Sequence, residues 1–274
     1  MFFSGLVPFS DFHLLVAKKR FGSKIHKTDG ISFIKLLFQK GNLIENENKK
    51  LYLSFALGQL SHYFLDHTCH PYVYYFSGFD EKGKLTGKYH YCHANFEAKI
   101  DASLAYFFNK KDLIEEPQKV LSIPIEELNF ISDCTDEVLE EFFSPEKFNH
   151  YYENGVNSMV KIYRFVHKND GKMGKLMGKN LLGQLLIPRE NDRIVLNDDH
   201  LTWLHPTKGY ETKESFMELY NKALDRFAQA LDVIISNNFD PECLDRFNTR
   251  ENYSGNKLDY RMVNKDTKQL LYKY

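Results

Sequence analysis

The stretch LGQLSHYFLDHTCHPY, residues 57–72, decides the fold that we expect for this chain. It lies in a run from about residue 51 to residue 75 that is rich in Leu, Ala, Phe and Tyr and has no proline before Pro71. An apolar run of this length is too long for a strand, and its composition is typical of a buried helix. The sequence therefore predicts a long buried helix here.

Three ionisable residues, His62, Asp66 and His70, recur at intervals of four along this predicted helix. Four residues advance an α-helix by about 400° and about 6 Å, so the three side chains form one stripe. Ionisable groups on a buried face are costly unless they are paired or bind a metal. A lone His-x-x-x-Asp pair is most often a hydrogen bond on a helix surface. A second pair with the same spacing is therefore needed before the pattern favours a metal site. His67 points about 100° away from Asp66 and is expected outside the ligand set.

A second pair with the same spacing, His93 and Glu97, lies on the next predicted helix, residues 89–108. Two facing helices could present three imidazoles and two carboxylates to a common space. These nitrogen and oxygen ligands suit zinc with open positions for water better than a closed structural site. His90 faces within about 60° of His93 and is an alternative to it, but the four-residue spacing to Glu97 favours His93.

Helical periods recur along most of the rest of the chain, and strand signals are few. Apolar residues follow helical spacing in residues 31–40. The sequence Ser144-Pro145-Glu146 predicts the start of a helix that runs to about His167. Ser215 and Glu218 form a capping-box pattern that predicts the start of the last long helix.

The composition supports a compact chain and excludes several classes of protein. Of the 274 residues, 43% are hydrophobic, and 36 basic residues balance 37 acidic ones, so a large core can form and disorder is excluded. We predict one all-α domain of roughly seven helices, residues 1–274, in which about 238–274 form a basic, Tyr-rich extension. The formal net charge of −1 gives no general attraction to nucleic acid, which could bind only as a substrate.

The sequence also predicts where the protein resides. The chain has no apolar run of the roughly eighteen residues that span a bilayer, and its first residues, MFFSGLV, have neither a basic leader nor a small-residue cleavage site. We therefore expect a cytoplasmic protein without stable membrane insertion. Its four cysteines form no C-x-x-C pair and indicate neither a disulfide framework nor a cysteine zinc site. The sequence does not specify an oligomeric state.

Three of these motifs carry a resemblance to a known family. Residues 57–72 resemble the signature helix of the bacterial zinc-dependent phospholipase C family, and His93-x-x-Phe96-Glu97-x-x-Ile100-Asp101 resembles its next metal-binding helix. Residues 197–206, with the segment from Ser215 to Tyr220, are similar to the C-terminal part of bacterial members. The resemblance extends roughly from Gly5 to residue 236. It implies an all-α fold with a zinc centre, shared with the single-strand-specific zinc nucleases.

The resemblance also implies roles for individual residues. One zinc would be held by His26, His62 and Asp66, with Asp66 bridging to another metal, and a separate zinc by His70, His93 and Glu97. Asp11 matches the aspartate that ligates zinc or acts as a base, so Asp11 and Asp66 are the candidate catalytic residues. Family members place a ligating N-terminal amine and a further histidine well before the Asp11 position. Only ten residues precede Asp11 here, so we expect a shortened N-terminus, two zinc sites and a third site without its family ligands.

The implied activity is zinc-dependent hydrolysis of a small-molecule or lipid phosphodiester, as in a phospholipase C. Two alternatives remain open: a related zinc nuclease or nucleotide phosphodiesterase, and a zinc-binding protein without catalysis. If the third metal is absent, less charge on the leaving oxygen is stabilised. Activated aryl diesters need little such help, so we expect them to be cleaved better than lipid or nucleotide diesters. Aromatic residues could form the wall of a substrate pocket, namely Phe12, Tyr72, Tyr74, Tyr75 and Phe76.

Overall fold

The structure, a computed structural model, describes residues 21–77, 87–169, 171–177, 185–206 and 208–255, without the side chains of 87–92. The predicted all-α fold is confirmed. The elements are α1 (Phe21–Ile25), α2 (Gly30–Asn42), α3 (Asn48–Ser77), α4 (Gly87–Phe107), α5 (Asp112–Glu115), α6 (Pro117–Val120), α7 (Ile125–Phe142), α8 (Tyr151–Val166), α9 (Lys172–Met177), η3 (Arg193–Leu196), β1 (Trp203–Leu204), β2 (Glu211–Thr212), α10 (Phe216–Ser236) and η4 (Pro241–Phe247). The two short strands pair antiparallel, with Trp203 opposite Thr212.

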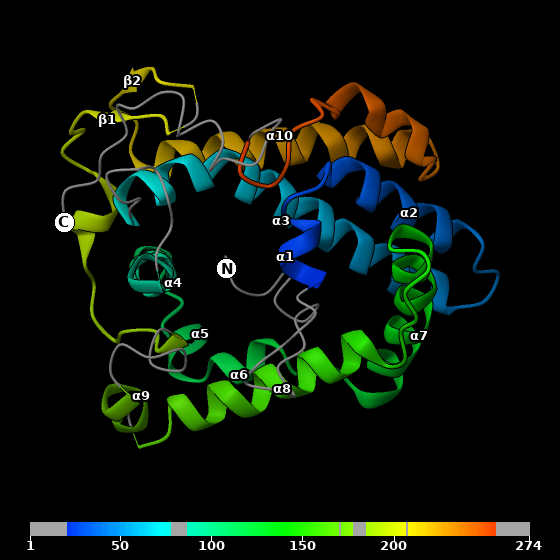
Figure 1. The fold of residues 1–274 in the computed structure, drawn as a ribbon, viewed down its shortest axis with the longest axis horizontal. Helices are drawn as coiled ribbons and strands as arrows, with labels where there is room; N and C mark the ends of the chain where they lie inside the picture. The colour runs from blue at the N-terminus through cyan, green and yellow to red at the C-terminus, as the bar shows by residue number, and fades with distance from the viewer. Residues whose placement is uncertain (1–20, 78–86, 170, 178–184, 207, 256–274) are drawn as a thin grey trace.

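Helix α3 is the central element, because α2, α4 and α10 all pack against it. Figure 1 shows α10 running along α3, while α8 follows the opposite edge of the view. The long helix predicted from the 57–72 stretch is therefore present, and it extends a few residues further at both ends. Pro71 lies inside α3 and does not end it.

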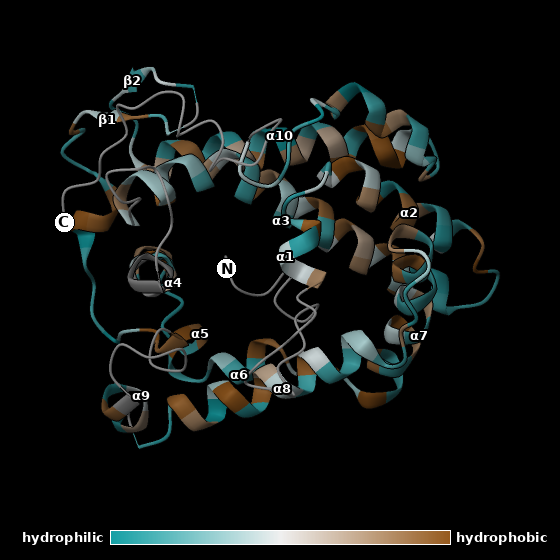
Figure 2. Cartoon of the chain, viewed as in Figure 1, coloured by the Kyte–Doolittle hydropathy of each residue, from teal (hydrophilic) through white to brown (hydrophobic). Residues whose placement is uncertain are grey.

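Hydrophobic side chains gather in three clusters. The largest joins α2, α3, α7, α8 and α10 around fully buried residues such as Phe38, Leu60 and Phe64. A second cluster surrounds Tyr72, whose hydroxyl donates to the main-chain oxygen of Val195 over 2.7 Å, so this predicted pocket aromatic belongs to the core. Figure 2 shows hydrophobic and hydrophilic residues interspersed along α8 and α10, as expected of amphipathic helices.

Two local predictions have different outcomes. The capping box at the start of α10 is confirmed, because Glu218 N–H donates to Ser215 Oγ and Ser215 N–H donates to Glu218 Oε2. The helix predicted to start at Ser144-Pro145-Glu146 is wrong at its start, since α8 begins at Tyr151. The Tyr151 N–H donates to Asp136 Oδ1 over 3.1 Å, so a side chain on α7 caps this helix through a tertiary contact.

The predicted number of helices is also too small for the part of the chain that the structure describes, which holds α1 to α10. Four of these, α1, α5, α6 and α9, have six residues or fewer. Helices this short span fewer than two turns and leave no periodic signal in the sequence. Within the described ranges, every helix is too short or too polar to cross a lipid bilayer.

Candidate metal centre

The first cluster of candidate ligands joins the end of α1 to the middle of α3. His26 follows α1, while His62 and Asp66 lie one turn apart on α3. Asp66 Oδ2 is 3.2 Å from His26 Nε2 and 3.2 Å from His62 Nε2. The His26 ring is oriented by its Nδ1–H, which donates to the main-chain oxygen of Gly22 over 2.8 Å and leaves Nε2 facing the carboxylate.

The second cluster joins α3 to α4. His70 Nε2 lies 3.4 Å from Glu97 Oε1, and His93 Nε2 lies 3.1 Å from the same oxygen. Among the described residues, these three and the first three form two groups in which one donor atom per residue lies within 4.8 Å of the others. Each group therefore has the ligand number and spacing that could hold a metal ion.

Asp66 lies between the two clusters. The same Oδ2 atom that faces His26 and His62 is 3.6 Å from His70 Nε2. Asp66 is 1% exposed, so its charge is stabilised by these neighbours and hardly by solvent. The two clusters thus form one continuous group of six side chains around a shared carboxylate.

Burial and neighbouring charges shift the pKa values of the clustered side chains in different directions. Burial, the largest influence, lowers the pKa of His62 to about 4, so this imidazole is neutral at pH 7. Burial alone would raise the pKa values of Asp66 and Glu97, but the surrounding histidines outweigh it and hold both below their usual values. Burial would lower the pKa of His70, but Asp66 and Glu97 raise it to about 9. The paired carboxylates therefore favour positive charge between the clusters.

Several buried polar atoms in this region make no hydrogen bond to any described residue. They are His62 Nδ1, His62 Nε2, Asp66 Oδ1 and Tyr253 Oη. His62 Nε2 is close to Asp66 Oδ2, but the pair is not aligned as a hydrogen bond. A buried polar atom without a partner costs about 1–3 kcal/mol, so such a concentration is typical of a site that binds a ligand. Imidazole and carboxylate donors fit zinc.

The other predicted residues are placed as follows. Asp11 and Phe12 lie outside the described residues, as does the side chain of His90. His67 is not in either cluster: its Nε2 is 2.8 Å from Glu251 Oε2, on another side of α3. Tyr74 does reach the site, with its ring centroid 4.9 Å from that of His93.

Tyr253 is a residue of this region that sequence reasoning missed. Its ring is fully buried, with centroids 4.9 Å from His26 and 5.8 Å from His62. Its main-chain oxygen accepts a hydrogen bond from His70 Nδ1 over 3.0 Å, 183 residues away in the sequence. Tyr253 lies in a polar segment without helical or strand periodicity, so no local signal marked it.

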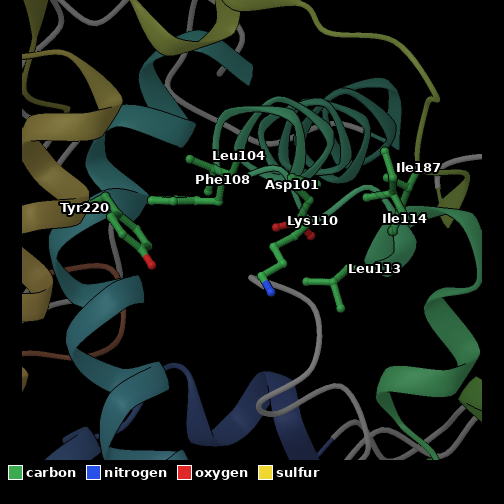
Figure 3. Close-up of a pocket in the computed structure, with 9 residues that line it drawn as sticks. Asp101, Leu104, Phe108, Lys110, Leu113, Ile114, Ile187 and Tyr220 are labelled. Atoms are coloured by element: carbon green, nitrogen blue, oxygen red, sulfur yellow. The ribbon is translucent and has the colours of Figure 1, made fainter.

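A cavity of about 400 Å³ opens beside α4, one turn beyond the second cluster. Its lining is mostly apolar, and Asp101, four residues after Glu97, contributes a buried carboxylate to it. Figure 3 shows the polar ends of Asp101, Lys110 and Tyr220 around this pocket, with Leu113 and Ile114 also lining it. The pocket thus joins an apolar surface to a few polar groups close to the candidate metal centre.

The fold and the two clusters define an all-α protein with a candidate zinc centre. A sequence profile of the family described as zinc dependent phospholipase C matches residues 8–164, which is more than half of the chain. The chain therefore belongs to the zinc-dependent phospholipase C family. All six clustered residues lie inside the matched range, and Tyr253 lies outside it. Comparisons with curated proteins and with solved structures found no match.

Proposed function

We propose that the chain hydrolyses the phosphodiester bond of a phospholipid, with one zinc at His26, His62 and Asp66 and another at His70, His93 and Glu97. The observation that carries this proposal is the position of Asp66 Oδ2, which faces histidines of both clusters within 3.6 Å. A carboxylate shared in this way can hold two cations close together. Paired zinc ions, when bound there, would activate a water molecule and neutralise the charge on the phosphoryl oxygens.

The exposure of the six side chains supports one direction of approach for a substrate. His26 and His93 are 30% and 20% exposed, whereas His62 and Asp66 are almost completely buried. The buried residues are fixed by the packing of α3, and the two more exposed histidines mark the solvent side of the centre. A phosphoryl group would therefore approach past His26 and His93, and Asp11 is the candidate base that the motif resemblance implies.

The cavity beside α4 supports a substrate with an apolar part. Asp101 at its edge lies one helical turn, about 6 Å along the axis, from Glu97. A diester held at the centre could therefore place an acyl chain against the apolar walls formed by Leu104, Leu113 and Ile114. A nucleic acid substrate would need a basic groove with stacking aromatics, and the balanced charge of the chain gives no support for one.

The test combines metal analysis with turnover. Purified chain would be assayed for zinc and then for hydrolysis of phosphatidylcholine micelles, an aryl phosphodiester and a single-stranded oligonucleotide. We expect zinc-dependent release of diacylglycerol from the micelles, and its loss in Asp66→Asn. Asp136→Asn is the matched control, because Asp136 is also buried but lies on α7 and caps α8. Cleavage of the oligonucleotide alone would favour the nuclease alternative, and zinc binding without any turnover would favour a non-catalytic protein.

A further inference from the structure

Residues 251–255, here called the strap, run across α3 and contact both candidate zinc clusters. The main chain of Tyr253 makes the closest connection. Its N–H donates to the main-chain oxygen of His26 over 3.3 Å, and its carbonyl accepts from His70 Nδ1 over 3.0 Å. Since His26 and His70 belong to different clusters, one residue of the strap is bonded to both.

The bond to Tyr253 fixes how His70 can act as a ligand. A main-chain carbonyl only accepts hydrogen bonds, so the His70 Nδ1 atom must carry the proton. The other ring nitrogen, Nε2, then faces Glu97 Oε1 at 3.4 Å and Asp66 Oδ2 at 3.6 Å. Metal-binding histidines characteristically donate their second ring N–H to a carbonyl or carboxylate, which orients the ring and makes it a better ligand.

A second set of contacts holds the strap against α3. Glu251 Oε2 is 2.8 Å from His67 Nε2, and Arg226 donates to His67 Nδ1 over 2.8 Å. Because Nδ1 of His67 accepts from Arg226, its Nε2 carries the proton that is donated to Glu251. His67 lies on α3, directly after Asp66, and therefore links the strap to Arg226 on α10.

A third set reaches the second cluster through an aromatic ring. Ser254 Oγ donates to the hydroxyl of Tyr74 over 3.2 Å. The Tyr74 ring centroid lies 4.9 Å from that of His93 and 5.4 Å from that of His70. Tyr74 thus packs against two candidate ligands while the strap fixes its hydroxyl end.

The end of the strap passes close to the α3 backbone, where a side chain would be tightly packed and strained. Gly255 has a φ of +70°, and a Cβ there would lie 3.0 Å from the main-chain oxygen of His67. This oxygen lacks its usual helical donor, because the residue four positions later is Pro71, which has no N–H. The same proline that interrupts the hydrogen bonds of α3 therefore marks the place where the strap passes over it.

We propose that Tyr253 and Gly255 are positioning residues of the metal centre: the strap holds His70 and His26 in the orientation in which they bind zinc. This inference rests on the proposed zinc centre, and it adds to it a segment outside residues 8–164, the range that matches the family. It predicts that displacing the strap weakens zinc binding although no candidate ligand is changed.

The main test is Gly255→Ala, with Gly209→Ala as its matched control. Both glycines have a positive φ, +70° and +72°, but a Cβ at Gly209 meets no atom within 4 Å. Zinc affinity would be measured by competition with a chromophoric chelator. We expect Gly255→Ala to bind zinc about 10–100-fold more weakly, the usual effect of losing a group that orients a metal ligand, and Gly209→Ala to bind as the wild type does. Equal affinity in the two variants would overturn the proposal.

A second pair of variants separates positioning from general stability. Tyr253→Ala removes the ring that contacts His26 and His62, while Tyr253→Phe keeps the ring and the backbone. We expect weaker zinc binding in the alanine variant and near wild-type binding in the phenylalanine variant. If the phenylalanine variant lost as much affinity as the alanine variant while both melted at the wild-type temperature without zinc, the loss would follow the hydroxyl, and positioning by the Tyr253 ring would be excluded.

The strap can also be tested when no metal is bound. If the wild-type chain bound no zinc, the proposed function would fail, but the orientation of His70 could still be read by NMR. The Nδ1–H proton of His70 should be protected from exchange with water in the metal-free wild type and in Gly209→Ala. It should lose this protection in Gly255→Ala. Unchanged protection in that variant would overturn the role of the strap independently of zinc.

Discussion

Asp66 Oδ2 lies 3.2 Å from His26 Nε2, although 40 residues separate the two in the sequence. This contact closes the first cluster, because His62 and Asp66 are already neighbours on α3 and need a third ligand from elsewhere. It places the end of α1 against the centre of α3, on the side that also faces α4. The expected zinc content of the chain and its stabilisation by zinc both depend on this arrangement.

Substitutions in the two clusters should affect zinc content differently. We expect Glu97→Gln and His26→Gln each to remove about one zinc per chain, because each belongs to one cluster. Asp66→Asn should lower occupancy of both, because Asp66 faces histidines of both clusters and an amide is a poorer ligand than a carboxylate. Metal analysis of the purified variants by mass spectrometry measures this. An unchanged zinc content in Asp66→Asn would contradict the shared role of this carboxylate.

Removing zinc should lower the thermal stability of the chain. A ligand that binds only the folded state stabilises it by about 2.7 kcal/mol when present at about 100 times its Kd. The metal-free protein also retains a buried atom facing the first cluster, His62 Nε2, that has no hydrogen-bond partner among the described residues. Thermal unfolding with and without a chelator, followed by readdition of zinc, measures the difference. A melting temperature that is the same with and without zinc would argue against binding in the folded state.

The pH dependence of stability should include a contribution from His205, outside the clusters. Burial lowers the pKa of His205 from its ordinary 6.5 to about 4. Between these values the unfolded chain binds a proton that the folded chain does not, so stability is lost as the pH falls from 6.5 towards 4. His205→Gln should flatten this part of a denaturation profile, while His200→Gln, at an exposed residue of the same loop, should not. Identical slopes for both variants would disprove the assignment.

Two glycines on neighbouring helices should respond to alanine in opposite directions. A Cβ at Gly30 would lie 2.4 Å from a ring carbon of Tyr63 and 2.8 Å from one of Tyr253, and both rings are fully buried. We expect Gly30→Ala to destabilise the fold by about 1–3 kcal/mol through overpacking. Gly58, in the middle of α3, has open space around it, so Gly58→Ala should stabilise by about 0.5–1 kcal/mol. Urea unfolding of both variants provides the comparison.

Filling the cavity beside α4 should separate lipid turnover from turnover of a small diester. Ala105 lines this cavity, and Ala105→Trp would occupy the space proposed for an acyl chain. The new side chain would keep about two methylenes of the acyl chain out of the cavity, and each loses about 0.8 kcal/mol of burial energy. We therefore expect kcat/KM for phosphatidylcholine to fall more than tenfold. Turnover of an aryl phosphodiester by the same variant should stay near the wild-type rate. Equal losses on both substrates would show that this cavity does not hold the apolar part.

The local features of this protein could be read from its sequence because they depend on residues close together in the chain. The four-residue spacing of His62, Asp66 and His70 identified both a helix and a shared face, since helical geometry converts that spacing directly into proximity. The capping box of Ser215 and Glu218 identified the start of α10 for the same reason. The resemblance to the family also rested on these local motifs.

Tertiary structure decided everything that requires residues from distant parts of the chain to meet. The start of α8 is set by Asp136 on another helix, and periodicity contains no information about such a cap. Which carboxylate lies between the clusters was implied only by the family resemblance, because spacing alone does not place α1 and α4 around α3. The orientation of His70 by Tyr253 left no trace in the sequence, since a main-chain carbonyl belongs to every residue and only folding brings this one to the ring.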